Sequence, residues 1–515
     1  MHRKRAEEFL KESASFRLGD LPTEGSHPKT KELSKWAQAG SPEELIPVIS
    51  LLKDIDHDAL TILHSKAPLF ETMRKDIKST LEKGHKIYFC GCGATGRLSL
   101  SLEFLWRKER SSHADRVVGL MAGGDVALVK AIEGFEDFPD YGARHLLELG
   151  FSDGDLLIST TEGGETPYVI GATEKGSEVS KQSPYFVYCN PDDVLCAKVD
   201  RSRRVIQNPK IKKISLPIGP MALSGSTRLQ ACTVMMLGVG LALLNYDTAE
   251  PIAAGIRSFQ DLLKKTDLSF LGSFVFDESD LYKRGSHVLY VTDEFGITVF
   301  TDTTERAPTF SLIPFENEKD QPVNPALCFL SLTHANSVED AWQKLFGRPP
   351  RPLEWREAKG LAGQGRLLGY DFSLFAEKRR FDPTSHLKYQ KFSILRSEQN
   401  SHELVLALSP YRHNLSLQNA SPLFEHLLLK VLLNIHSLLV MGRLGRYQGN
   451  VMTWVKPSNK KLIDRSIRYV SLLLKNEGIA RFSYDDIAYQ LFAEIERLKD
   501  NESVVLKTFH SLHKI

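Results

Sequence analysis

Residues 87 to 99 read Ile87-Tyr88-Phe89-Cys90-Gly91-Cys92-Gly93-Ala94-Thr95-Gly96-Arg97-Leu98-Ser99. An apolar run typical of a buried strand passes here into a glycine-rich turn and then into a helical pattern. Such a turn brings backbone N–H groups and the positive end of a helix macrodipole close to an anion. Phosphate is the obvious candidate, although a purely structural tight turn would have the same pattern. The rest of the chain must distinguish these interpretations.

Four short apolar runs are each followed by a stretch suited to a helix. The runs cover residues 86–90, 117–121, 155–159 and 185–188. This alternation predicts an α/β fold with a parallel sheet flanked by helices, in the three-layer arrangement of flavodoxin-like proteins. A second alternation begins at residues 287–292, continues through 296–301 and reaches a strand near 403–408. We therefore expect two α/β units in tandem.

Small polar residues gather after the predicted strands. After the third run the candidate phosphate ligands are Thr160, Thr161, Gly163, Gly164 and Thr166. Residues 219–228 again combine glycine with hydroxyl groups, among them Ser226, and with one cation. Ligands of parallel sheets lie beyond the carboxyl ends of the strands, so three such loops indicate one anion site. The alternative is that these loops are ordinary capped helix starts.

The three loops, in this order and spacing, resemble the sugar-isomerase (SIS) domain family. The resemblance is closest to the branch of the N-acetylmuramic acid 6-phosphate etherases and the glucokinase regulatory protein. Its G-x-G-T-S-G-R-L loop corresponds to residues 91–98, with Ala94 and Thr95 in place of Thr and Ser. Its G-G-x-x-A…E-G-x-E-D segment corresponds to residues 123–137, and its G-S-S/T-R-M/L run to residues 225–229.

Chain length and the resemblance together predict four parts. The etherases carry one SIS domain and dimerise, whereas the regulatory protein joins two and adds a helical lid. A chain of 515 residues fits three or four units. The expected parts are an N-terminal arm (1–45), a first SIS domain with the sugar-phosphate site (46–250), a second SIS domain (251–420) and an all-helical lid (421–515).

Two glutamates carry the acid and base chemistry of the etherase branch. By the motif match one is Glu136, with Glu133 contacting the sugar ring, and a structural salt bridge is the alternative. The other normally lies eight residues after the loop arginine, where this chain has Leu105. The segment 304–310 looks like the missing motif displaced into the second domain. We therefore expect Glu305 to reach across the two domains into one composite catalytic site.

The resemblance implies further ligand-binding positions. In the first loop they are Gly93, Ala94, Thr95 and Gly96. Arg446 stands where the relatives place a lysine, so we predict it as a lid cation, with an ordinary solvated arginine as the alternative. Glu162 and Glu165 border the loop after the third strand, where etherases carry an arginine. Either these carboxylates face ring hydroxyls or the ligand is less anionic than a phosphate.

Two functions from different classes follow from the resemblance. The first is a sensor similar to the glucokinase regulatory protein, which binds a phosphosugar such as fructose 6-phosphate and alters the interface with a protein partner, for example a sugar kinase. The second is an etherase-like lyase acting on N-acetylmuramic acid 6-phosphate, or another sugar-phosphate isomerase. A scaffold that has lost its ligand is a third alternative.

Composition argues against several other classes. Lys and Arg number 66 against 64 Asp and Glu, so a net charge of +2 predicts no nucleic-acid or membrane partner. The six cysteines lack paired CxxC spacings, which favours a reducing cytoplasm. No residue pattern predicts a metal or a dinucleotide cofactor. The apolar stretch 427–441 is interrupted by polar residues, so we expect no membrane span.

Overall fold

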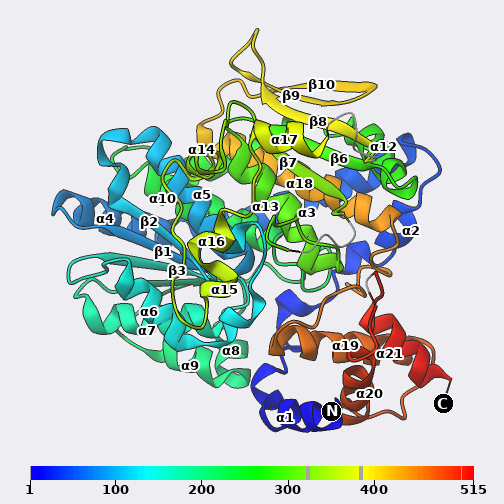
Figure 1. The fold of residues 1–515 in the computed structure, drawn as a ribbon. Coiled ribbons are helices and arrows are strands. Elements are labelled where there is room, and N and C mark those ends of the chain that lie inside the picture. Colours follow the sequence, from blue (N-terminus) through cyan, green and yellow to red (C-terminus); the bar gives the residue numbers. More distant parts are fainter. Residues whose placement is uncertain (1, 321–324, 382–386, 500, 515) are drawn as a thin grey trace.

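Two five-stranded sheets organise the chain (Figure 1). The computed structural model describes residues 2–320, 325–381, 387–499 and 501–514. The first sheet has the order β2-β1-β3-β4-β5 and is parallel throughout. Its strands are β1 (Ile87–Gly91), β2 (Val117–Met121), β3 (Leu156–Thr160), β4 (Tyr185–Tyr188) and β5 (Lys212–Ser215). The flavodoxin-like prediction is confirmed, and the four predicted strands agree with the structure to within one residue.

Helices surround the first sheet because β1 to β4 are buried at every position. The helices of this first unit are α3 (Ile46–Ser65), α4 (Ala67–Glu82), α5 (Gly93–Glu109), α6 (Pro139–Glu148), α7 (Pro167–Val179), α8 (Asp192–Lys198), α9 (Asp200–Gln207) and α10 (Gln230–Leu244). Helix α10 is buried along its whole length, which explains its continuous apolar sequence.

The second sheet has the order β10-β9-β8-β6-β7. Its strands are β6 (His287–Thr292), β7 (Cys328–Leu332), β8 (Tyr389–Arg396), β9 (Glu403–Leu408) and β10 (Tyr411–Ser416). Strands β6, β7 and β8 are parallel, whereas β9 and β10 run antiparallel at one edge. Short turns join β8 to β9 and β9 to β10, and such turns allow only antiparallel pairing.

The helices between residues 252 and 443 are α11 (Ile252–Lys265), α12 (Leu271–Lys283), α13 (Gly296–Phe310), α14 (Val338–Phe346), α15 (Lys359–Ala362), α16 (Gln364–Leu367), α17 (Leu374–Arg380) and α18 (Pro422–Arg443). Among them α12, α13 and α17 contact the second sheet, whereas α11 packs on α3, α4 and α10 of the first unit. Helix α18 is long and apolar enough to cross a membrane, but 94% of its most apolar window is buried in the protein. It packs against α10, α12 and α13 and therefore forms part of the core between the two units.

A group of four helices, which we call the helical cap, lies at one end of the molecule (Figure 1). It consists of α1 (His2–Glu12), α19 (Lys460–Asn476), α20 (Tyr484–Ile495) and α21 (Val504–His513), and α1 packs against α20. The polar N-terminal arm thus contains a helix, held by Phe9 against Phe492 with 5.9 Å between ring centroids. Ser483 caps α20 in a capping box with Asp486, as its sequence indicates. The short helix α2 (Leu33–Ala37) packs on α18.

A buried ion-pair network joins the two units. Arg348, in the loop after α14, lies with its Nε 3.0 Å from Glu103 Oε1 and its Nη1 2.6 Å from Asp125 Oδ2. Arg351 adds a second contact to Glu103, with 2.6 Å between Nη2 and Oε1. Glu103 therefore stabilises the joint between the two units.

Candidate functional site

The glycine-rich turn between β1 and α5 has the geometry of an anion-binding loop. A side chain at Gly91 would place its Cβ 2.3 Å from the backbone of Thr95, so only glycine fits there. Gly93 has a φ of +53°, in the left-handed region that glycine adopts without strain. Thr95 Oγ1 accepts a hydrogen bond from the Cys92 amide at 3.1 Å and closes a capping box. The first turn of α5 is thereby fixed with its N-terminus at a cavity.

This cavity, which we call the composite cavity, has a volume of about 130 Å³ and is lined by three parts of the chain. The first unit contributes Cys92, Gly93, Ala94, Arg97, Ala131, Glu136, Glu162, Thr166 and residues 225–228. Helix α13 of the second unit contributes Glu305, Pro308 and Thr309. The cap and the loop before it contribute Met452, Val455, Asn459, Lys461, Leu462 and Arg465.

Glu305 reaches the composite cavity because α13 is anchored to the first unit. Thr304, its neighbour, donates a hydrogen bond to the carbonyl of Leu128 at 2.6 Å and lies 3.5 Å from Arg97 Nη2. Glu305 itself is half-buried and forms no hydrogen bond or ion pair with any residue that the structure describes. Its carboxylate is therefore available to a ligand.

Glu136 lies in the short 3₁₀ helix Glu133–Asp137 and faces the cap. Its Oε1 lies 3.2 Å from Lys461 Nζ, and its Oε2 accepts a hydrogen bond from Cys92 Sγ at 3.3 Å. Burial, followed by repulsion from Glu136, raises the pKa of the adjacent Asp137 to about 6. Two neighbouring carboxyl groups thus sit beside one lysine at the edge of the cavity.

Glu162 is the carboxyl group most strongly perturbed by this environment. Only 8% of its surface is exposed, and its Oε1 has no hydrogen-bond partner among the residues that the structure describes. Burial, and then repulsion from Glu305 and Glu136, raises its pKa to about 7 although Lys461 opposes the shift. Glu162 therefore exchanges a proton near neutral pH, and it lines the same cavity as Glu136 and Glu305.

Comparison with known proteins identifies the family. Residues 69–176 match the profile of the glucokinase regulatory protein N-terminal SIS domain. The N-acetylmuramic acid 6-phosphate etherase of Mesorhizobium japonicum is 30% identical over 246 residues, which are 47% of this chain and 71% of the relative. The etherase of Vibrio campbellii is 30% identical over 250 residues, 48% of this chain and 72% of the relative. This chain belongs to the SIS domain family.

Within that family the similarity is to the branch of the etherases and the glucokinase regulatory protein, as the loops predict. Among solved structures, tagatose-6-phosphate ketose/aldose isomerase from Escherichia coli superposes with a TM-score of 0.41 and 11% identity. The superposition covers 82% of this SIS chain and 98% of the isomerase.

The structure brings some of the predicted SIS site residues to the cavity and places others behind it. Those that line the composite cavity are Gly93, Ala94, Glu136, Thr166, Ser226 and Glu305. Thr95, Gly96, Thr160, Thr161, Gly163 and Gly164 are absent from the described lining and shape the loops instead. Thr161 Oγ1, for example, lies 3.0 Å from Thr166 Oγ1 and so orients that hydroxyl group. The side chain of Glu133 lies outside the described part of the chain.

Arg446, predicted as the lid cation, lies away from the composite cavity. Its guanidinium stacks on Trp454, 4.0 Å from the ring centroid, and its Nη2 donates to Asn501 Oδ1. Lys461 of α19 lines the composite cavity instead, beside Glu136. The sequence signal for Lys461 was weak because it stands in a basic helix, where solvated lysines are the ordinary expectation.

The other cations of the composite cavity are engaged within the protein. Arg228 Nη1 lies 3.0 Å from Asp302 Oδ1, and Arg465 Nη2 lies 2.5 Å from Glu24 Oε1. Although Glu24 is buried, Arg465 and Arg468 lower its pKa to about 2. Glu24 of the N-terminal arm therefore ties the cap to the rest of the chain. No group of three or more metal-ligating side chains suited to a metal ion occurs among the described residues.

Proposed function

We propose that the composite cavity binds a sugar phosphate and that the chain is a carbon–oxygen lyase of the N-acetylmuramic acid 6-phosphate etherase type. The observation that supports this is the position of Glu136, Glu162 and Glu305 in one cavity with the N-terminus of α5. The named relatives at 30% identity favour the lyase over the sensor that the sequence suggested first.

In this proposal the phosphate lies at the start of α5. Unpaired amides and the helix macrodipole favour an anion there, and the hydroxyl of Ser226 adds a donor. Lys461 supplies positive charge from the cap. These groups hold the sugar so that its ring faces the carboxylates.

The carboxyl groups then divide the proton transfers. Glu136 faces the cation of Lys461 and is a carboxylate that can accept the C2 proton. Removal of that proton leads to cleavage of the C3–O bond, and the departing lactate oxygen takes a proton. Burial, and then repulsion from Glu305, raises the pKa of Glu162 to about 7, so Glu162 can supply that proton near neutral pH, and Glu305, in the same cavity, is placed to relay it to the departing oxygen.

Incubation with N-acetylmuramic acid 6-phosphate tests the reaction. We expect release of D-lactate, measured with a coupled lactate dehydrogenase assay, and its loss in Glu136→Gln and in Glu305→Gln. Absence of D-lactate with the parent protein, under conditions where a relative releases it, would overturn the lyase assignment.

A sensor of sugar phosphates is the second candidate, and one observation favours it. A volume of about 130 Å³ is below the range of typical ligand pockets, about 300–1,000 Å³. Because α19 forms part of the wall, a sugar phosphate would displace the cap on binding. Fructose 6-phosphate that raises the melting temperature, with no lactate released from the muramic acid phosphate, would favour the sensor.

A further inference from the structure

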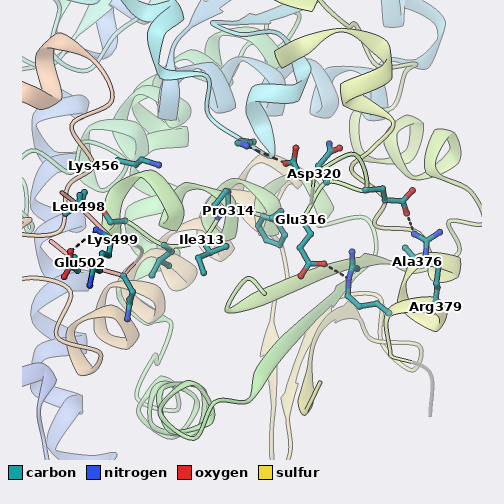
Figure 2. Close-up of a pocket in the computed structure, with 18 residues that line it drawn as sticks. Ile313, Pro314, Glu316, Asp320, Ala376, Arg379, Lys456, Leu498, Lys499 and Glu502 are labelled. Carbon is teal, nitrogen blue, oxygen red and sulfur yellow. Dashed lines mark hydrogen bonds and ion pairs between the residues drawn. The ribbon is translucent and has the colours of Figure 1, made fainter. Parts of the chain in front are cut away.

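The arginines that line two cavities of this protein differ in their partners. A second cavity, with a volume of about 730 Å³, lies between the second unit and the cap (Figure 2). Its described arginines are both ion-paired, Arg379 with Glu318, and Arg380 with Glu316 at 3.5 Å between Nε and Oε2. Two of the three arginines described in the lining of the composite cavity are paired with carboxylates as well.

Arg97, the third arginine of the composite cavity, contacts only uncharged groups among the described residues. Its Nη2 lies 3.5 Å from the carbonyl oxygen of Ala127, 3.4 Å from that of Leu128 and 3.5 Å from Thr304 Oγ1. These contacts are longer than the usual N–H···O hydrogen bond of about 2.7–3.2 Å. Its Nε is buried and has no hydrogen-bond partner in the described part of the chain. The guanidinium therefore has donor groups left for a ligand.

The burial of Arg97 indicates which kind of ligand group it would accept. Only 1% of the residue is exposed, and a guanidinium keeps its charge in proteins. A buried charge is unfavourable unless it is paired, so a ligand that brings an anion to this position is favoured. A carboxylate matches the planar guanidinium best, because two parallel N–H groups can donate to its two oxygen atoms.

Arg97 lies beside the part of α13 that carries Glu305. Thr304, whose hydroxyl group contacts Arg97 Nη2, directly precedes Glu305 in the chain. The same hydroxyl group donates to the carbonyl of Leu128 at 2.6 Å and so fixes α13 against the first unit. Arg97 and Glu305 both line the composite cavity. A ligand atom that receives a proton from Glu305 therefore lies near the guanidinium of Arg97.

The leaving group of the proposed reaction carries a carboxylate at the corresponding place. In N-acetylmuramic acid 6-phosphate an ether oxygen links C3 of the sugar to the lactyl group. A single carbon atom separates this oxygen from the lactyl carboxylate. When Glu305 faces the ether oxygen, the carboxylate is thus within reach of a side chain that contacts the neighbouring Thr304.

We propose that Arg97 binds the lactyl carboxylate and makes the composite cavity selective for sugar phosphates that carry a 3-O-carboxyalkyl ether. This assignment rests on the proposed lyase function, because it takes Glu305 as the group that faces the ether oxygen. N-acetylglucosamine 6-phosphate and fructose 6-phosphate have no anion at this place. Since the carboxylate keeps its charge during the reaction, the contact favours substrate binding and not the chemical step itself.

Calorimetric titration with two ligands tests the assignment in a Glu136→Gln background, which prevents turnover. The ligands are N-acetylmuramic acid 6-phosphate and its lactyl carboxamide, which has the same shape without the charge. With arginine at position 97 we expect the acid to bind at least about tenfold more tightly than the amide. In Arg97→Gln this preference should fall below about threefold, because the charge-assisted contact is lost. Arg97→Lys should keep part of it, since it keeps the charge but not the planar fork.

Controls separate this role from a loss of folding or of phosphate binding. Arg356→Gln, at an exposed position, should keep the full preference for the acid. Circular dichroism identifies a variant that fails to fold, and if Arg97→Gln does so, a smaller preference in Arg97→Lys carries the test.

Two outcomes would overturn the assignment of Arg97 alone. One is equal affinity for acid and amide with Arg97 intact. The other is an equal loss of affinity for both ligands in Arg97→Gln, which is expected if the guanidinium holds the phosphate instead. Absence of binding by both ligands would overturn the proposed function together with this assignment.

Discussion

Lys461 of α19 forms an ion pair with Glu136 of the first unit, with 3.2 Å between Nζ and Oε1. The same ammonium lies 3.7 Å from Glu165 Oε1. Burial opposes a charge on Lys461, but Glu136 and Glu165 raise its pKa above the usual range. One cation of the cap thus holds two carboxylates of the first unit, which couples packing of the cap to the state of the composite cavity.

Replacement of Lys461 by glutamine should destabilise the protein. Glu136 and Glu165 are both buried, and they would lose their shared cation, so we expect the free energy of unfolding to fall by about 1–3 kcal/mol in urea. Lys460→Gln is the matched control, because that lysine pairs with the exposed Glu12 and should change the value by less than about 0.5 kcal/mol. Equal losses in the two variants would contradict this account.

Glu305→Gln should separate activity from stability. Since Glu305 has no partner among the described residues, its neutralisation should leave the free energy of unfolding within about 0.5 kcal/mol of the parent. If Glu305 transfers a proton, D-lactate release should fall by about 10²–10⁴-fold. Glu339→Gln, at an exposed position of α14, should change neither quantity. Retained activity in Glu305→Gln would exclude that role.

The sequence allowed the first sheet to be predicted because its strands are short, fully buried apolar runs with polar turns between them. Strand β5 was not predicted, because its residues Lys212 and Lys213 are only partly buried at the edge of the sheet and give no apolar run. Helix α18 was expected to begin the lid, but its apolar residues cover its whole circumference. Such a helix is buried in a core, here between α10, α12 and α13.

The composite site was harder to predict residue by residue. Glu305 could be inferred from a displaced motif, whereas the partner of Glu136 depended on how the cap packs. Lys461 and Arg446 are both cations of the C-terminal region, and only tertiary structure separates the one at the cavity from the one on Trp454. Local sequence carries little information about such long-range contacts.

Glu162 should make stability depend on pH. Burial and the repulsion from Glu305 and Glu136 raise its pKa from 4.5 to about 7, so the folded state holds a proton that the unfolded chain releases. The stability that this bound proton contributes to the folded state is therefore present at pH 4.5 and is lost as pH rises to about 7. We expect the free energy of unfolding of Glu162→Gln to exceed that of the parent by about 1–3 kcal/mol at pH 8 and to match it near pH 4.5.

Urea unfolding at both pH values measures this difference. Glu178→Gln, at an exposed position of α7, is the control and should follow the parent at both pH values. A Glu162→Gln variant whose stability runs parallel to that of the parent between pH 4.5 and 8 would show that this carboxyl group does not titrate there.

The joint between the two units should depend on Arg348. Its guanidinium is buried with Glu103 and Asp125, so Arg348→Met leaves two buried carboxylates with less compensation. We expect the free energy of unfolding to fall by about 3–5 kcal/mol, against less than about 0.5 kcal/mol for the exposed Arg356→Met. Because Arg351 still contacts Glu103, most of the loss should come from Asp125. The double variant Arg348→Met, Asp125→Asn should therefore recover part of it, and purely additive losses would contradict that assignment.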